Sequence, residues 1–514
     1  VDGGNDTVGV GTTEGNIFGT SGSANEFGVQ ASGTNTGGII AISATGTGFS
    51  GIDIGTTSLR RGGIFTVDGS HLGLYTNSSD SGVGLTERFR VASDGSLSTP
   101  TSGTSNVRFG VNAGNSIASG GNYNTVVGDE AGTAITTGDE NVFVGYVAGD
   151  AISTAGGNTA LGAYALTSDT LGSLSVAIGN NALNSQNFTT ATNAYNVAIG
   201  KNAGLSVTTG IQNTLIGGLS GDALTDADFN VAVGYNSLTT NTLGSRSTAV
   251  GHDALANQNY TTATDSYNTA VGQSAGFAVT TGTNNTLIGG LAGDALTTGS
   301  SNTLLGYNAG GAESTGSNNV IIGQAGQAQT LTSDTVAVGD GALQTNTKSA
   351  KNTAIGRSAL RVLNHTTATD AYNVAVGYNA GIAVTTGIQN TFVGGTTGTS
   401  TTDADYNVAM GYGALYTNTL GSKSTAIGVS ALQNQNYTTA TDSNNTAVGY
   451  VAGLSVTTGV QNTLIGSKAG DALTDADQNV AFGVTALGQD TLGSRSTAIG
   501  TNALSDQNFT TATN

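Results

Sequence analysis

Apolar and polar residues alternate over short stretches of five positions throughout most of the chain. In each stretch the fourth position is apolar, the fifth is always Gly, and the eighth residue is nearly always Ala or Ser, as in the copy that begins at Asn268. This alternation has the period of two that is typical of β-strands, and no window shows the 3.6-residue period of an amphipathic helix. The pattern predicts an all-β chain whose fourth-position side chains point into a narrow interior.

The stretch occurs 23 times, with first positions from residue 106 to residue 496. The usual step from one copy to the next is 17, but typically every fourth step is 21, so that a super-repeat has a period of 72, as from Ser175 to Ser247. A second short strand is expected after each copy, as at Leu205–Thr209, followed by a Thr-Gly turn. Two strands and two corners in each 17-residue unit form one coil of a parallel β-solenoid or β-roll. Because the repeat is interrupted at Asn514, we expect the natural chain to continue.

The invariant residues have structural explanations. The fifth-position Gly provides either a positive φ or room for another backbone to approach. Asn fills the first position in 18 of the 23 copies, and stacked Asn side chains can form a ladder that satisfies the turn amides. A coil with one aliphatic residue and several Ala buries little apolar area, so three chains around a common axis are expected to stabilise one another. At about 4.8 Å per coil, 23 coils would extend ~110 Å.

The copies are confined to one part of the chain. Residues 1–100 lack them and contain irregular apolar stretches between Gly, Ser and Thr turns, and the chain's one Pro is Pro100. We therefore predict two domains, a small β-rich module at 1–100 and a solenoid shaft at 101–514.

Composition narrows the classes of partner. Gly accounts for 81 of 514 residues and charged residues for 9%, which argues against a helical protein. The formal net charge of −19 repels phosphate backbones and anionic bilayers, so nucleic acid is not an expected partner. The chain has no Cys, which excludes disulfides and thiolate metal sites. Its apolar runs are too short to cross a bilayer, so we expect no membrane insertion in this segment.

Two resemblances point to a biological role. Copies such as Ser175–Gly179 resemble the head repeats of YadA-like trimeric autotransporter adhesins, although those coils are shorter, and the 17-residue spacing also resembles shafts of phage tail fibres. The segments Leu74–Asn77 and Thr86–Leu97 are similar to a stretch of phage tail-fibre proteins. The resemblance implies a homotrimeric tail-fibre shaft in the virion that extends and presents host-receptor binding. Its implied partners are itself, other tail or virion proteins, and a host cell-surface glycan or protein.

Two other roles fit the same repeats. One is the passenger of a bacterial trimeric surface adhesin, and the other is a self-assembling extracellular filament. An enzyme is not expected, because His71, His252 and His365 stand in unrelated contexts and no nucleophile or acid recurs beside them. We expect no cofactor and no metal.

Acidic clusters such as Asp222, Asp226 and Asp228 resemble calcium ligands in type. They recur at one place in the super-repeat, and a cation follows about one coil later, just before the next copy. Side chains one coil apart face each other at the strand spacing, so we favour interlayer salt bridges over calcium sites. The predicted pairs are Asp228 with Arg246, Asp334 with Lys351, Asp405 with Lys423, and Asp477 with Arg495.

The 21-residue coils are the candidate binding sites. Their extra residues must bulge, and each contains an aromatic residue or His before a Thr-Thr-Ala-Thr sequence, often with a Tyr seven positions later. We hypothesise a ridge that contacts surface glycans through these side chains. In the alternative interpretation the rings fold back over the corner or fill the seam between chains. The candidate residues are Phe188, Tyr195, Tyr260, Tyr267, His365, Tyr372, Tyr437 and Phe509.

Overall fold

The computed structural model describes residues 25–30, 39–44, 49–56, 59–67, 71–77, 85–93, 97–99, 101–330 and 332–513. The chain divides into two compact units, Val1–Ala194 and Tyr195–Asn514, which are described in turn. The described residues form only β-strands, turns and irregular segments, which confirms the all-β prediction.

The first unit begins with a seven-stranded antiparallel sheet in which each strand pairs with the next along the chain. Long alternating stretches without Pro favour such a sheet. The bounds are β1 (Asn25–Gln30), β2 (Ile39–Ala44), β3 (Phe49–Thr56), β4 (Leu59–Val67), β5 (His71–Asn77), β6 (Leu85–Ala92) and β7 (Leu97–Ser98). The sheet therefore ends next to residue 100, although the division into domains at that position stays a prediction.

Three-residue strands follow, one in each coil, and pair in parallel with the coils before and after. In the first unit they are β8 (Val107–Phe109), β9 (Thr125–Val127), β10 (Val142–Val144), β11 (Thr159–Leu161) and β13 (Val176–Ile178). Val142 pairs with Thr159, and Val107 pairs with Thr125, so the partners are separated by one coil of sequence. Equivalent residues of successive coils therefore lie directly above one another.

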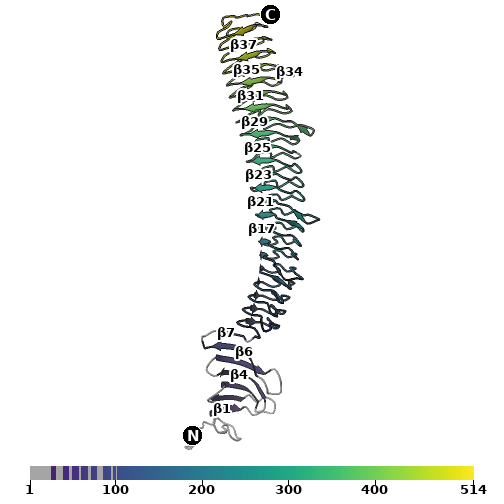
Figure 1. Cartoon of the computed structure of the whole chain (residues 1–514), viewed down its shortest axis with the longest axis vertical. Helices are drawn as coiled ribbons and strands as arrows, with labels where there is room; N and C mark the ends of the chain where they lie inside the picture. Colours follow the sequence, from purple (N-terminus) through teal and green to yellow (C-terminus); the bar gives the residue numbers. More distant parts are fainter. Residues whose placement is uncertain are drawn as a thin grey trace, which may run out of the picture. The chain divides into compact units, whose positions relative to one another are not determined.

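The second unit repeats this arrangement over 18 coils, and Figure 1 shows β17 to β37 stacked in chain order. Its three-residue strands are β15 (Val197–Ile199), β16 (Thr214–Ile216), β17 (Val231–Val233), β19 (Thr248–Val250), β21 (Thr269–Val271), β22 (Thr286–Ile288), β23 (Thr303–Leu305), β24 (Val320–Ile322), β25 (Val336–Val338), β27 (Thr353–Ile355), β29 (Val374–Val376), β30 (Thr391–Val393), β31 (Val408–Met410), β33 (Thr425–Ile427), β35 (Thr446–Val448), β36 (Thr463–Ile465), β37 (Val480–Phe482) and β38 (Thr497–Ile499). The strand pairing thus confirms a parallel β-solenoid, and its usual coil has the predicted length, as from Thr214 to Val231.

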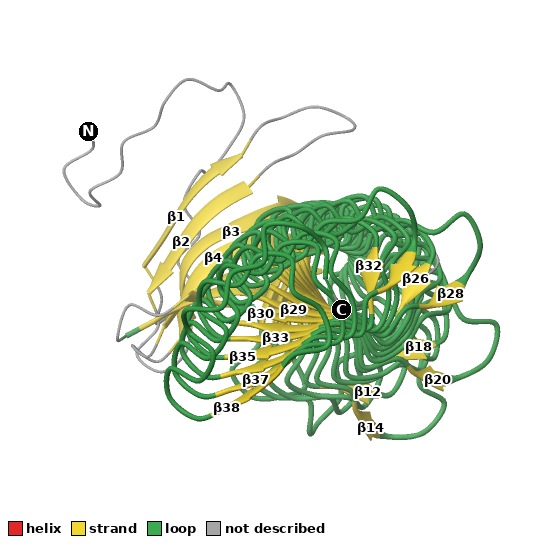
Figure 2. Ribbon diagram, turned by 90° about the horizontal axis from the view of Figure 1, so that it is seen from above, coloured by secondary structure: helices red, strands yellow, loops and turns green. Residues whose placement is uncertain are grey.

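The predicted second strand of each coil is wrong for the ordinary coils. At Leu205–Thr209 the chain forms turns, closed by bonds such as the one from the amide of Leu205 to the carbonyl of Asn202. Two-residue strands occur instead where a 21-residue coil lies above another coil, and Figure 2 shows them on a different side of the coils from the three-residue strands. The pairs are β12 (Gly172–Ser173) with β14 (Thr192–Asn193), β18 (Gly244–Ser245) with β20 (Thr264–Asp265), β26 (Ser349–Ala350) with β28 (Thr369–Asp370), and β32 (Gly421–Ser422) with β34 (Thr441–Asp442).

The interior is lined by the third position of each copy, and the prediction for the fourth position is wrong. Ala249, Leu287 and Phe392 are fully buried, as is the third residue of nearly every other copy. The fourth residue points outward, so that Leu305 is 42% and Phe482 is 54% exposed. A shift of one residue along a strand exchanges its two faces, and the small Ala side chains fit the thin interior better.

The Asn ladder is confirmed. The amide of Asn141 donates to Oδ1 of Asn124 at 3.0 Å, and the amide of Asn158 donates to Oδ1 of Asn141 at 3.0 Å. The Nδ2 group of Asn141 donates to the carbonyl of Ala155 at 3.0 Å, and these Asn side chains are fully buried. The ladder satisfies backbone groups that the thin core would otherwise leave without partners.

The fifth-position Gly meets both of its predicted requirements. Gly251 has a φ of 140°, and a Cβ atom on it would lie 2.3 Å from the carbonyl oxygen of Gly272 in the next coil. An L-residue would therefore be strained in its backbone and would also collide with the neighbouring coil.

Candidate functional site

The residue just before each copy occupies a left-handed backbone conformation. The φ angles are 61° at Arg246 and 49° at Tyr267, and non-Gly residues hold similar values at nearly all equivalent positions. The side chains at these positions form a column on the surface, in which large residues such as Tyr195 and Phe229 remain exposed. Several predicted site residues lie in this column.

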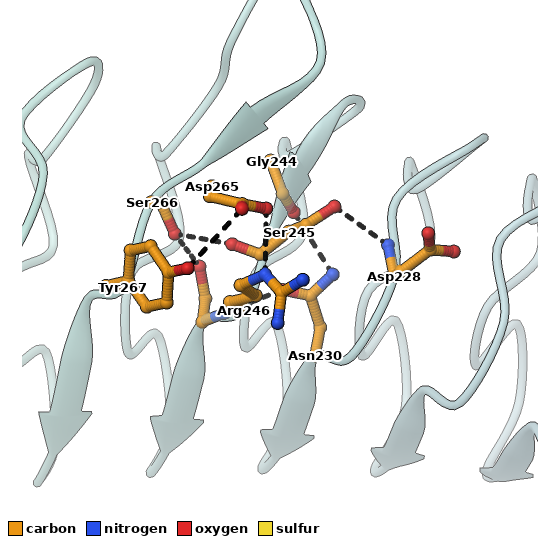
Figure 3. Close-up of polar contacts among 9 residues, drawn as sticks. Asp228, Asn230, Gly244, Ser245, Arg246, Asp265, Ser266 and Tyr267 are labelled. Carbon is orange, nitrogen blue, oxygen red and sulfur yellow. Dashed lines mark hydrogen bonds and ion pairs between the residues drawn. The ribbon is translucent and has the colours of Figure 1, made fainter.

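One cluster in the column combines rings with a charge pair, and Figure 3 shows part of it. We call Phe229, Arg246, Asp265 and Tyr267 the ring–cation cluster. The guanidinium carbon of Arg246 lies 4.8 Å from the ring centre of Phe229 and 5.8 Å from that of Tyr267. Its Nε atom lies 3.0 Å from Oδ1 of Asp265. Three successive coils thus contribute to one exposed patch that offers apolar faces, a carboxylate and a guanidinium.

Two further super-repeats pair their cations with a carboxylate in the same way. Nζ of Lys351 lies 2.6 Å from Oδ2 of Asp370 and 5.2 Å from the ring centre of Tyr372. Nζ of Lys423 lies 2.6 Å from Oδ2 of Asp442. The hydrogen bonds to these carboxylates raise the pKa of both lysines. Since the pairs are solvent-exposed, their contribution to stability is small.

The predicted partners of these cations were therefore wrong. Each cation turns toward the coil that follows it, whereas the earlier aspartates accept hydrogen bonds from the coil that precedes them. The amides of Ile211, Ile388 and Val460 donate to Oδ1 of the earlier aspartates at 2.7 to 2.8 Å. Those acceptors are Asp228, Asp405 and Asp477. A hydrogen bond from a backbone amide to a carboxylate is charge-assisted, so it can take the place of the predicted ion pair.

The fourth predicted aspartate follows the same rule, whereas the last cation, Arg495, turns toward the coil that precedes it. Asp334 accepts from Nδ2 of Asn318 at 3.1 Å and does not pair with Lys351. Nε of Arg495 donates to Oε1 of Gln478 at 3.0 Å. The prediction that Asp228 and Arg246 lie one above the other is correct, because the amide of Arg246 donates to the carbonyl of Asp228 at 3.0 Å. Only the predicted contact between their side chains is wrong.

The aromatic residues of the 21-residue coils form two classes. The prediction that the first aromatic protrudes is wrong for Phe188, Tyr260 and Tyr437, which are at most 5% exposed. The hydroxyl of Tyr260 donates to the carbonyl of Gly282 at 2.7 Å, and burial raises the pKa of this residue to about 12. The ring lies against Gly244, where a Cβ atom would lie 2.5 Å from it, so the Gly makes the space that the ring fills.

Tyr437 repeats these contacts, with its hydroxyl 2.7 Å from the carbonyl of Gly459 and its pKa raised by burial to about 12. His365 takes the equivalent place, with Nδ1 bonded to Ser349 and Nε2 bonded to the carbonyl of Thr386. Phe509, in the last coil of the described chain, is 41% exposed.

The second aromatics remain on the surface. Tyr195, Tyr267 and Tyr372 are about half exposed, and two of them stack with the cations of the column. Together with Phe509, they are the aromatic members of the predicted ridge that the structure leaves accessible to a ligand.

Sequence reasoning missed a buried motif that marks the 21-residue coils. Where the step is 21, Ser usually replaces the ladder Asn, and a Gln follows it at a spacing of 11. Nε2 of Gln258 donates to Oγ of Ser247 at 2.7 Å, and Nδ2 of Asn268 donates to Oε1 of Gln258 at 2.9 Å. The remaining Ser–Gln pairs are Ser175 with Gln186, Ser424 with Gln435 and Ser496 with Gln507.

The exception supports this interpretation. One 21-residue coil keeps its ladder residue, Asn352, and the position of the Gln is then taken by buried Leu363. The amide of Asn373 accordingly donates to Oδ1 of Asn352 at 3.1 Å across the longer step. The pairing of Ser with Gln at a spacing of 11 was visible in the sequence.

Other candidate chemistry has local partners. Among the described residues, no three or more His, Cys, Asp or Glu side chains gather as metal ligands would. Asp222 accepts from Thr239, and Asp226 accepts from Thr209. His252 lies 3.0 Å from Asp253 and stacks on Tyr235, and the side chain of His71 is outside the described part. The absence of catalysis and of metal stays a prediction.

Comparison with known proteins does not assign a family, because no family model, curated protein or solved structure matches the chain. In the described part of the chain, no helix is long and apolar enough to cross a membrane. Any assignment of function therefore rests on the repeats and on the surfaces that they form.

Proposed function

We propose that the chain is a segment of the shaft of a homotrimeric tail fibre, which holds a receptor-binding tip away from the virion. The observation that carries this proposal is a stripe of exposed aliphatic residues formed by the fourth position of successive copies. Leu305, Met410 and Ile427 are each more than a third exposed, and no fourth-position residue from Ile199 to Ile499 is buried. The stripe thus follows all 18 coils of the second unit.

An apolar stripe of this length is unusual on the surface of a monomer. Contiguous exposed apolar patches beyond a few hundred Å² mark interaction surfaces. The interior cannot compensate for it, because the third position is mostly Ala and buries little area. Association through the stripe would remove this aliphatic surface from water and thicken the core.

A second copy of this chain is the partner that best matches the stripe. The stripe repeats at the coil spacing, so a surface complementary along its whole length needs the same repeat. Three is the number of chains that the resemblance to trimeric autotransporter adhesins implies. A closed arrangement of three stripes around one axis would leave no stripe exposed.

The ring–cation cluster suits the second part of the proposed role, contact with a host surface. Exposed rings stack on the apolar faces of sugars, and neighbouring carboxylates and guanidinium groups bond to hydroxyls. Tyr195, Tyr267 and Tyr372 recur along the shaft, so weak contacts would be multiplied by repetition and by three chains.

Electron microscopy with antibodies against the coils tests the biological assignment. In a culture that produces the chain, we expect the antibodies to decorate fibres on phage particles and to block adsorption to the host. Decoration of the bacterial surface without particles would replace the tail fibre by the surface adhesin. Decoration of free filaments would replace it by the self-assembling filament.

A further inference from the structure

A cavity of about 410 Å³ lies in the first unit, beside the last strands of the antiparallel sheet and the first coil. Small-molecule sites in proteins have volumes of roughly 300 to 1,000 Å³. Its lining includes Glu87 and Arg88 from β6, Thr99 after β7, and Arg108 from β8. Two arginines therefore line one small cavity in a chain whose net charge is −19.

Arg108 occupies a position that is otherwise apolar. It is the third residue of the first copy, and each of the other 22 copies has Ala, Val, Leu, Ile or Phe there. Arg108 is half-buried, and its Nε donates to the carbonyl of Ala113 at 2.5 Å. Burial, together with the charge of Arg88, lowers the pKa of Arg108. The fold thus holds a cation where a cation is unfavourable.

The acids near the cavity do not neutralise these two arginines. Glu87 pairs with Arg90, with Nη2 and Oε2 2.5 Å apart and Nε and Oε1 3.0 Å apart. Nε of Arg88 donates to Oγ1 of Thr76 at 2.8 Å. No carboxylate of the described residues forms an ion pair with Arg88 or Arg108. Within the described residues the hydrogen bonds of both guanidinium groups come from Nε, which leaves their Nη groups to an acceptor from outside.

We propose that this cavity binds an oxyanion group between the guanidinium groups of Arg88 and Arg108. A sulfate, phosphate or carboxylate accepts two parallel hydrogen bonds from a guanidinium, which makes arginine the residue suited to such groups. Thr99 accepts a bond from the amide of Arg108 at 3.0 Å, so its hydroxyl proton is available to the anion. A bound anion would offset the repulsion between the two cations.

A purely structural role for Arg108 makes a different prediction. In that role the aliphatic part of its side chain would cover the open end of the solenoid interior, as the stems of long cationic residues cover apolar surfaces. If covering were its whole role, Arg108→Met would behave like the wild type, and no anion would bind. The oxyanion site requires the charge as well as the stem.

Calorimetric titration of the full chain tests the proposal, with sulfate, phosphate, acetate and glucuronate as probes at constant ionic strength and glucose as the neutral control. We expect saturable binding of one anion per chain, and no heat from glucose. Arg88→Gln and Arg108→Met should each weaken binding at least tenfold, because each removes one guanidinium. Arg361→Gln is the matched control, since that exposed Arg bonds through Nε to Gln344 at 2.9 Å and should leave binding unchanged.

The probes also separate the sources of the oxyanion. Binding of sulfate and phosphate without glucuronate supports a free inorganic anion, whereas tighter binding of glucuronate than of acetate supports a sugar carboxylate. The proposal is overturned if no probe saturates, or if both Arg variants bind as the wild type does. Melting temperature measured with and without sulfate gives a second readout, and the wild type should gain stability that both variants lack.

Discussion

A charge placed in the aliphatic stripe should separate the chains without unfolding them. Leu305 lies in β23 and is 42% exposed, so the fold already buries more than half of its side chain. Full burial of a Leu is worth about 1.5 to 3 kcal/mol, so the exposed fraction corresponds to about 1 kcal/mol per chain. Leu305→Asp removes this free energy of association from each of the three chains. It also places carboxylates in an apolar seam, at several kcal/mol for each buried ion.

Light scattering during size exclusion measures the outcome. We expect Leu305→Asp to elute with the mass of one chain at concentrations where the wild type is associated, and to keep the circular dichroism of a β-protein. Ser301→Asp is the control, because it adds the same charge to the same coil at an exposed position with a φ of 61°, a conformation that Asp tolerates. The reasoning fails if Leu305→Asp keeps the mass of the wild type, or if Ser301→Asp dissociates equally.

Three further predictions concern the coils. Gly251→Ala should lower the melting temperature strongly, because its Cβ would lie 2.3 Å from a carbonyl oxygen. Gly290→Ala is the control and should have little effect, because the nearest atom to its Cβ would be a ring carbon 3.7 Å away. Equal effects in thermal melts would contradict the packing of the coils. Gln258→Leu should cost about 1 to 3 kcal/mol in chemical denaturation, because it removes two buried hydrogen bonds. Adding Ser247→Asn should restore stability as in the natural Asn–Leu coil, and the absence of rescue would refute the Ser–Gln interpretation. Burial raises the pKa of Glu313, so the charged carboxylate destabilises the fold at pH values above that pKa. This destabilisation disappears below the pKa of Glu in the unfolded chain, about 4.3, because the carboxyl is then protonated in both states. Glu313→Gln should therefore raise the melting temperature at pH 7 and change it little at pH 3.5, and a gain of equal size at both values would contradict this assignment.

Periodicity predicted the fold but not the direction of each side chain. Spacing identified the coils, the role of the fifth-position Gly and the Asn ladder. The alternation left two faces to choose from, and both carried apolar residues, because Ala249 and Val250 are neighbours on opposite faces. The fourth position was predicted to face the interior because it carries the larger residue, whereas the thin interior accepts mostly Ala at the third position.

The contacts predicted for the candidate site residues were wrong for a related reason. In a solenoid every residue has a neighbour one coil before and one coil after, so the spacing of Arg246 fits either side. Asp228 accepts a hydrogen bond from the amide of Ile211, and Arg246 pairs with Asp265 in the following coil instead. Likewise, the burial of Tyr260 depends on the space above Gly244, which sequence spacing does not reveal. The Ser–Gln motif is different, since its spacing of 11 was present in the sequence.

Sedimentation equilibrium of the unmodified full chain tests the central claim most directly. We predict a single species with three times the chain mass of 50.5 kDa, because the aliphatic stripe along 18 coils requires a matching surface and the resemblance to trimeric adhesins implies three chains. A species of 50.5 kDa at every concentration would contradict it, since the stripe would then be stable in water without a partner.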